Sequence, residues 1–201
     1  MAAYKAEFEY NYQKANGSSL RTKSFAYNTR LNQLGSKFPG LTNAVFSNKL
    51  TSGLIKRTLG IASERSLPQV SHQTLTSYYQ KNHRRLEAPI KKVYLFNDEF
   101  TNYLESEIGI AAIKLLNGLN YEVEIVKHPE SGRTFISKGF LEQAKDLANR
   151  NISIFSPLIS EDTPLLGIEP SSILTFRDEY LRLADDKAAA QSLAKHTLLI
   201  D

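Results

Sequence analysis

The chain has 201 residues, of which 41% are hydrophobic and 23% are charged, the balance of an ordinary globular protein. It contains no cysteine, which excludes disulfide bonds and thiolate ligation of zinc or of iron–sulfur clusters. Its apolar runs fall short of the ~18 residues that a membrane-spanning helix needs, and its start lacks the pattern of a secretory leader. We therefore expect a cytoplasmic protein with no integral membrane segment.

Charge is distributed unevenly along the chain. Residues 1–92 carry 15 Lys and Arg against 4 Asp and Glu, a net charge of +11, whereas residues 93–201 carry 10 against 17, a net charge of −7. A basic half can indicate binding to nucleic acid or to an anionic membrane surface. Here the basic residues are interspersed with Leu, Phe and Tyr, and the one dense run is residues 81–85. We therefore expect no nucleic-acid partner, and favour a basic segment that lies against the acidic half or another acidic domain.

Residues 1–90 show the periodicity of helices. Tyr4, Phe8 and Tyr12 recur at a spacing of four, the stripe of an amphipathic helix. Similar apolar stripes run through residues 19–34 and 41–59, and a short helix is predicted at residues 74–80. The stripes predict packing surfaces rather than catalytic sites, so we interpret residues 1–90 as a basic, all-helical segment.

From residue 91 onward the pattern alternates between strands and helices. Strands are predicted at 92–96, 121–126 and 164–168, with a further strand beginning at 197–200, and helices at 105–117, 134–149, 171–183 and 187–195. This alternation predicts an α/β fold, a small parallel sheet with flanking helices in Rossmann-like βαβ order. A strand beginning at the last residues would leave an unpaired sheet edge, so we expect the α/β region, residues 91–201, to be truncated on its C-terminal side.

Polar loops follow the first three predicted strands, at residues 97–99, 128–133 and 169–172. The carboxyl ends of parallel strands meet in one crevice of an open α/β sheet, so these loops are the candidate site. Its candidate residues are Asn97, Asp98, Glu99, His128, Glu130, Ser131, Arg133, Glu169, Ser171, Ser172, Arg177, Asp178 and Glu179.

The residue types in these loops leave several functions open. The carboxylates could hold a hard cation, Arg133 and the helix start after Pro170 could hold an anion, and Glu130 with Glu169 could form a buried pair for proton transfer. Equally, the Glu and Ser side chains could cap helices while Arg133 pairs with a carboxylate. On residue types alone we favour this structural role.

Three segments of the α/β region together resemble a cysteine-rich repeat, known as the CCG repeat. They are residues 93–103, residues 131–139 and residues 168–179. The repeat occurs in the iron–sulfur part of FAD-linked oxidoreductases that act on 2-hydroxy acids, including glycolate oxidase, D-lactate dehydrogenase and relatives of D-2-hydroxyglutarate dehydrogenase. Residues 1–8 and 64–68 are similar to segments that follow the ferredoxin-like module in fused members of this family.

The departures from the repeat fall on its cysteines. In the family one cysteine follows the first strand, an adjacent pair lies in the second loop and a C-x-x-C motif lies in the third. These positions are Asn97, then Glu130 and Ser131, then Glu169 and Ser172 in this chain. The resemblance therefore implies a degenerate repeat that has lost its iron–sulfur ligands. We expect no cofactor and no metal in this chain, with Glu130 and Glu169 as metal ligands the weaker alternative.

The resemblance implies an accessory module, an electron-transfer scaffold of a FAD-containing 2-hydroxy-acid dehydrogenase that is inactive alone. Its partners would be the other parts of the parent chain: a FAD domain, a ferredoxin-like module with 4Fe-4S clusters, and a second repeat introduced by a strand such as residues 198–201. The parent enzyme could place it at the membrane periphery. The alternative is a domain that binds a small carboxylate or a divalent metal through the three loops, with His128, Arg133, Ser171 and Arg177 contacting the anion.

Overall fold

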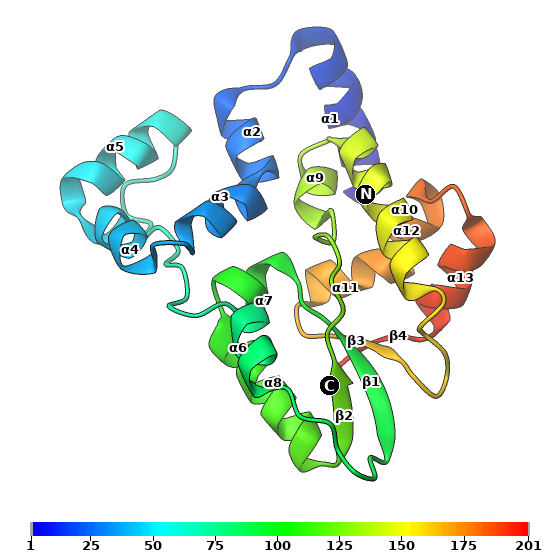
Figure 1. Cartoon of the computed structure of the whole chain (residues 1–201). Helices are drawn as coiled ribbons and strands as arrows, with labels where there is room; N and C mark the ends of the chain where they lie inside the picture. Colours follow the sequence, from blue (N-terminus) through cyan, green and yellow to red (C-terminus); the bar gives the residue numbers. More distant parts are fainter. Residues whose placement is uncertain (1, 201) are drawn as a thin grey trace.

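The computed structural model describes residues 2–200 and contains helices along its N-terminal part followed by a parallel α/β sheet (Figure 1). The elements are, in chain order, α1 (Ala2–Asn16), α2 (Leu20–Ala26), α3 (Asn28–Gly35), α4 (Pro39–Ser47), α5 (Lys49–Leu59), α6 (Leu75–Asn82), β1 (Lys91–Phe96), α7 (Glu99–Tyr103), α8 (Ser106–Gly118), β2 (Tyr121–Glu124), α9 (Arg133–Ser137), α10 (Leu141–Phe155), β3 (Leu165–Gly167), α11 (Pro170–Arg177), α12 (Glu179–Leu183), α13 (Lys187–Lys195) and β4 (Thr197–Leu199).

The sheet has four parallel strands in the order β2-β1-β3-β4. Val93 pairs with Val123 on one side of β1, and Tyr94 pairs with Leu165 on the other. The chain therefore runs from β1 outward to β2 and later returns to the opposite edge of β1. This confirms the predicted fold class and brings the loops after β1, β2 and β3 to the same end of the sheet, where ligand crevices form in open α/β sheets.

Helices cover both faces of the sheet. On one face Leu75 of α6 and Ile113 of α8 pack with Leu95. On the other face Phe96 packs with Phe155 of α10 and with the buried residues of α11, α12 and α13. The strands read as short apolar runs because both of their faces are buried in this way.

Several predicted helices are broken in two by a local feature of the backbone. The helix predicted at 134–149 is α9 followed by α10, because Gly139 adopts a left-handed conformation with φ of 71°. A Cβ atom at Gly139 would lie 2.7 Å from the backbone nitrogen of Tyr10, so glycine also lets α1 approach this turn closely. After the break α10 extends to Phe155, six residues beyond the predicted end of the helix.

The apolar stripes of the N-terminal helices are largely exposed. The opposite face of α1 packs on α9 and α10 through Ala6, but Tyr4, Phe8 and Tyr12 are 82%, 70% and 57% exposed. The prediction of helices is confirmed, although the helices predicted at 19–34 and 41–59 are split into α2–α3 and α4–α5. Most of the stripe residues are not covered by other parts of the described chain, so their predicted role as packing surfaces stays a prediction.

Strand β4 pairs with β3 and ends at Leu199, so the last strand is confirmed as far as that residue. Asp201, which the family resemblance also assigned to this strand, lies outside the described residues. Within residues 2–200 no helix has the length and apolar character needed to cross a membrane.

Gly167 provides a test of the packing between β3 and α11. A Cβ atom at this position would lie 2.3 Å from the Cβ of Ile173, a fully buried residue. We expect Gly167→Ala to lower the free energy of unfolding by about 1–3 kcal/mol through overpacking, measured by urea denaturation. The matched control is Gly118→Ala at the end of α8, where an added Cβ meets nothing within 4 Å. A loss of stability in Gly118→Ala as large as that in Gly167→Ala would contradict this packing.

Candidate functional site

The loops after β1 and β2 are joined by a buried carboxyl group. Glu99, the first residue of α7, is 3% exposed, and Ser131 is fully buried. The backbone N–H of Ser131 donates to Glu99 Oε2 at 3.0 Å, and the Ser131 hydroxyl donates to Glu99 Oε1 at 2.6 Å. Both oxygens of a buried carboxyl group thus receive a hydrogen bond, which offsets the cost of removing them from water.

Three further buried side chains extend this contact into a network that we call the Glu99–Ser131 hub: Ser172, Tyr180 and Asn151. The hydroxyl of Ser172, from the third loop, lies 3.5 Å from that of Ser131. The Tyr180 hydroxyl donates to the Ser131 carbonyl at 2.8 Å and accepts from Asn151 Nδ2 at 2.8 Å. All three polar loops therefore meet at the hub, as the parallel sheet predicted.

Local sequence positions the hub residues. Asp98 caps α7 by accepting from the backbone N–H groups of Phe100 and Thr101, each at 2.9 Å, so Glu99 begins the helix and points inward. In the second loop Gly132 adopts a positive φ of 79° immediately before α9, a conformation that favours glycine. The Ser131 hydroxyl then accepts from the backbone N–H of Arg133 at 3.1 Å.

Burial shifts the titration of the carboxyl groups in these loops. Desolvation raises the pKa of Glu99 to about 7, and the hydrogen bonds from Ser131 oppose this rise. Desolvation also raises the pKa of Asp98, against the hydrogen bonds from Thr101 and Phe100. The hub therefore contains a carboxyl group that holds its proton to a higher pH than an exposed glutamate does.

His128 is held neutral by burial and by its hydrogen bonds. Its ring stacks on Phe96 with centroids 4.3 Å apart. Its Nε2 accepts from the backbone N–H of Asn97 at 3.2 Å, so Nδ1 carries the proton and donates to the Pro129 carbonyl at 2.8 Å. Burial lowers the pKa of His128 to about 4, which removes it as a proton donor or anion ligand near neutral pH.

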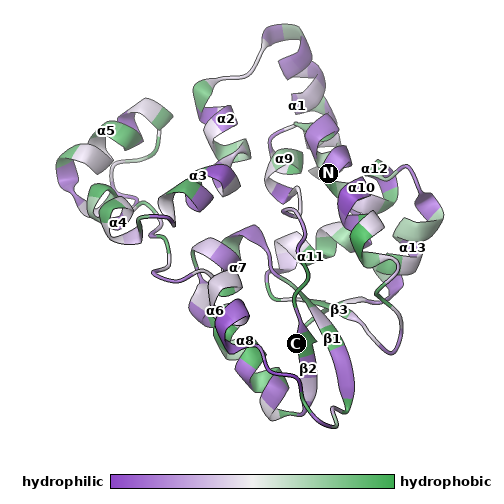
Figure 2. Cartoon of the chain, in the orientation of Figure 1, coloured by the Kyte–Doolittle hydropathy of each residue, from purple (hydrophilic) through white to green (hydrophobic). Residues whose placement is uncertain are grey.

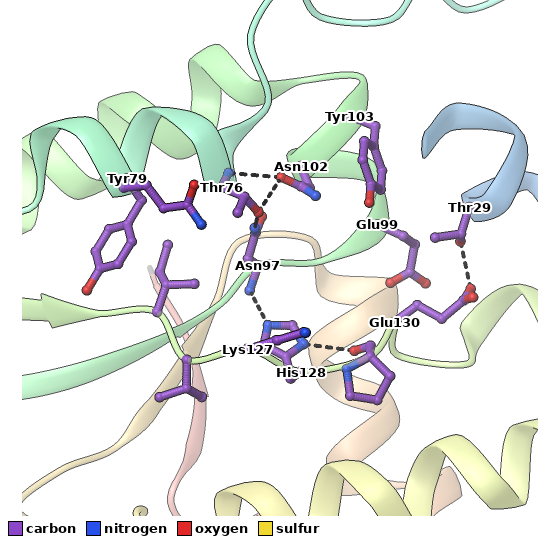
Figure 3. A pocket seen from close by; sticks show the side chains of 14 residues that line it. Thr29, Thr76, Tyr79, Asn97, Glu99, Asn102, Tyr103, Lys127, His128 and Glu130 are labelled. Carbon is purple, nitrogen blue, oxygen red and sulfur yellow. Dashed lines mark hydrogen bonds between the residues drawn. The ribbon is translucent and has the colours of Figure 1, made fainter. Parts of the chain in front are cut away.

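A cavity of about 500 Å³ opens beside the hub, between α6, α7 and the loop after β2 (Figure 3). Among its lining residues are Asn97, Glu99, His128 and Glu130. Glu130 Oε2 accepts from the hydroxyl of Thr29 at 2.6 Å, which ties the helical region to the second loop. Burial raises the pKa of Glu130.

Asn97 lies at the junction of this cavity with α6. Its side-chain amide donates to the Thr76 hydroxyl at 2.9 Å, and that hydroxyl donates to Asn102. Its Oδ1 is buried and has no hydrogen-bond partner within the described part of the chain. Asn97 therefore fixes α6 against the end of β1.

The remaining candidates lie away from the cavity. Glu169 caps α11 by accepting from the backbone N–H and the hydroxyl of Ser171 at 3.1 and 2.7 Å. Arg133 pairs with Glu179 at 2.6 Å. Arg177 is exposed at the end of α11.

Glu130 and Glu169 have different hydrogen-bond partners, in contrast to the proposed acid pair. Throughout residues 2–200 no group of three or more His, Asp or Glu side chains is placed to hold a metal ion. Nor do the residues at the positions that the resemblance assigned to cysteines offer ligands for an iron–sulfur cluster. Ser131 and Ser172 are fully buried, and the Ser131 hydroxyl is already bonded to Glu99.

Several residues of the site were not assigned a role from the sequence. Glu99 belongs to the first predicted loop, and its position one residue after a helix cap was the available signal. Tyr180 lies within a predicted helix and Asn151 lies two residues beyond the end of another, and their inward orientation follows from packing. Thr29 is 101 residues from Glu130 in sequence, and no pattern connects the two.

Comparison with known proteins shows that the sequence of this chain is similar to that of a group of enzymes. The matches include three curated proteins named D-2-hydroxyglutarate dehydrogenase. The protein from Pseudomonas putida is 25% identical over 171 residues, 81% of this chain and 17% of the relative. The protein from Haemophilus influenzae is 24% identical over 147 residues, which are 69% of this chain and 14% of the relative. The protein from Pantoea ananatis is 25% identical over 158 residues, which are 73% of this chain and 15% of the relative.

The chain is similar to one region of a dehydrogenase. It spans 14–17% of the length of these three relatives, so most of each relative lies outside the matched region. No family model matches the chain, and no solved structure matches it significantly. The similarity agrees with the family named from the sequence, at the level of a dehydrogenase-related region.

The pKa of Glu99 predicts a pH dependence of stability. Its folded-state pKa of about 7 lies above the ordinary value of 4.5, so the stability that its protonated form contributes is fully present below pH 4.5. This stability is lost as the pH rises through about 7. The shift corresponds to about 3 kcal/mol at most.

We expect the difference in unfolding free energy between wild type and Glu99→Gln to fall by up to this amount between pH 4.5 and about pH 8. His128 acts in the opposite direction, because its lowered pKa makes stability rise between about pH 4 and 6.5. Its contribution is the same in wild type and in Glu99→Gln, so it cancels in the difference and the effect of Glu99 remains. Urea titrations at each pH measure it, with the exposed Glu161→Gln as the matched control. A wild-type minus Glu99→Gln difference that does not change with pH would refute the assignment.

Proposed function

We propose that the chain is an accessory module of a flavin-linked 2-hydroxy-acid dehydrogenase, in which the Glu99–Ser131 hub has replaced a cluster site. The observation that supports this most is the similarity over 81% of the chain to a protein that is about six times longer than the matched region. The enzyme's chemistry would then belong to the parts of the protein outside this region. Within this proposal, FAD and 4Fe-4S clusters bind in those parts.

The hub is suited to a scaffolding role. A cluster in the family's repeat would tie the first, second and third loops together through thiolates. In this chain, oxygen-based hydrogen bonds from Ser131 to Glu99 and a contact between Ser131 and Ser172 join the same three loops. Such bonds contribute about 1 kcal/mol each, and they hold loop geometry without any redox capacity. Electron transfer would therefore pass by this module rather than through it.

The proposal predicts that the isolated chain is colourless after anaerobic purification and does not oxidise D-2-hydroxyglutarate. It also predicts that a chimera of the Pseudomonas putida relative, in which this chain replaces the matched region, retains dye-coupled dehydrogenase activity within roughly tenfold of the parent, about 1.4 kcal/mol in the barrier. The relative with the matched region deleted is the control, and we expect it to be inactive. Visible flavin or iron–sulfur absorbance in the isolated chain, or a chimera no more active than the deletion, would reject the proposal.

The cavity supports a second candidate, the binding of a small polar molecule. Its lining includes the carboxyl groups of Glu99 and Glu130, the amide of Asn97 and one cationic side chain, that of Lys127. Within residues 2–200 neither carboxyl group forms a salt bridge, and Arg133 is already paired with Glu179. Such a lining favours a ligand that donates hydrogen bonds, such as an amine, over the carboxylate expected from the sequence.

Titration calorimetry with spermidine and with D-2-hydroxyglutarate separates these ligand classes. We expect heat of binding with spermidine and a loss of affinity of about tenfold in Glu130→Gln, about 1.4 kcal/mol. Glu142→Gln, at an exposed residue on α10 outside this cavity, is the matched control. Heat with neither ligand would reject the second candidate.

A further inference from the structure

We infer that helices α2–α5, residues 20–59, form a docking arm for an acidic protein surface with an apolar centre. The partner surface would lie in the part of a D-2-hydroxyglutarate dehydrogenase-like protein outside the region that this chain matches. This inference rests on the proposed function and names the partner that the accessory module binds. Helices α2 and α3 contact α9 and α7, and α4 and α5 project away from the sheet beyond α3 (Figure 1).

Large apolar side chains of the arm are exposed. Ala26 is the one buried hydrophobic residue among residues 20–59, all of which the structure describes. Leu31, Leu34, Phe38, Leu41, Leu50 and Leu54 are between 53% and 84% exposed. Figure 2 shows this mixture of hydrophobic and hydrophilic residues along α3, α4 and α5. Exposed apolar residues gathered on neighbouring elements mark interaction sites in soluble proteins.

The charge of the arm is of one sign. Residues 20–59 contain seven Lys and Arg and no Asp or Glu. Within the described chain none of these seven forms a salt bridge. Exposed apolar side chains combined with charge of one sign suit a protein interface, and charge complementarity favours an acidic partner. The arm therefore specifies the chemistry of the surface it fits.

The kind of exposed residue favours a protein over nucleic acid or membrane. Five of the six exposed side chains named above are leucine, which cannot stack on bases as the aromatic residues of single-strand-binding proteins do. Helices that lie in a membrane surface present one continuous apolar face, whereas the arm consists of four short helices of 7 to 11 residues.

The length of the relatives outside the matched region indicates where such a partner surface would lie. The Pseudomonas putida protein has more than four fifths of its length outside the matched region. The α2–α3 part of the arm is joined to the α/β region, because Thr29 donates to Glu130 and Thr134 donates to the carbonyl of Ala26 at 3.0 Å. A partner bound to this part of the arm would therefore lie close to the second polar loop.

Hydrogen exchange in the chimera described above tests the inference. We expect the amides of α2–α5 to exchange at least tenfold more slowly in the chimera than in the free chain, with the protection lost in Leu31→Ser/Leu34→Ser and weakened by high salt. Leu115→Ser/Leu119→Ser on α8 is the matched control, since these residues are similarly exposed but lie outside the arm. Binding in trans gives an independent measurement. Sedimentation velocity of the free chain mixed with the relative that lacks its matched region shows whether the two form a complex, and whether Leu31→Ser/Leu34→Ser abolishes it.

Each outcome decides the inference. Equal exchange of the arm in chimera and free chain, or no binding in trans, overturns it. So does a dimer of the free chain that Leu31→Ser/Leu34→Ser abolishes, or a salt-sensitive complex of the arm with DNA or anionic vesicles. A protected arm in an inactive chimera supports the docking surface and rejects the proposed function. An active chimera with an unprotected arm supports the proposed function and rejects the docking surface.

Discussion

The contact between Glu99 and Ser131 is the interaction on which the architecture of the polar loops depends. A carboxyl group that is 3% exposed is costly to bury unless its oxygens are hydrogen-bonded. Ser131 supplies both bonds, one from its backbone and one from its hydroxyl. The loop after β2 must therefore adopt one conformation, in which Gly132 and α9 follow in fixed positions and Tyr180 reaches the Ser131 carbonyl.

This network occupies the positions that the proposed family resemblance assigns to cluster ligands. The Ser131 and Ser172 hydroxyls lie 3.5 Å apart, and the Ser131 hydroxyl is hydrogen-bonded to Glu99. The neutral His128 and the raised pKa of Glu99 have the same cause, which is exclusion of water from the loops. The hub is thus a dry, hydrogen-bonded structure, and the neighbouring cavity is the place where a ligand has room to bind.

The helical N-terminal region has two different surfaces. One joins the α/β part through the cluster that contains Ala6, Ala26 and Phe135, and through the bond from Thr29 to Glu130. The other leaves leucines and basic residues exposed. A region whose apolar residues are mostly exposed gains little hydrophobic stabilisation from its own chain, and this imbalance is the physical basis of the docking arm.

The sequence by itself determined the fold class, because alternating apolar runs and helical stripes report local burial directly. It also determined the convergence of the three loops, which follows from parallel strands, and the charge difference between the two halves. Only the tertiary structure decided which polar residues meet. The pairs Glu99–Ser131 and Thr29–Glu130 join residues 32 and 101 positions apart, and hydrogen bonds between such distant residues leave no periodic signal. The exposure of the Tyr4, Phe8 and Tyr12 stripe was likewise decided by tertiary packing, since periodicity identifies an apolar face of a helix but not the partner that covers it.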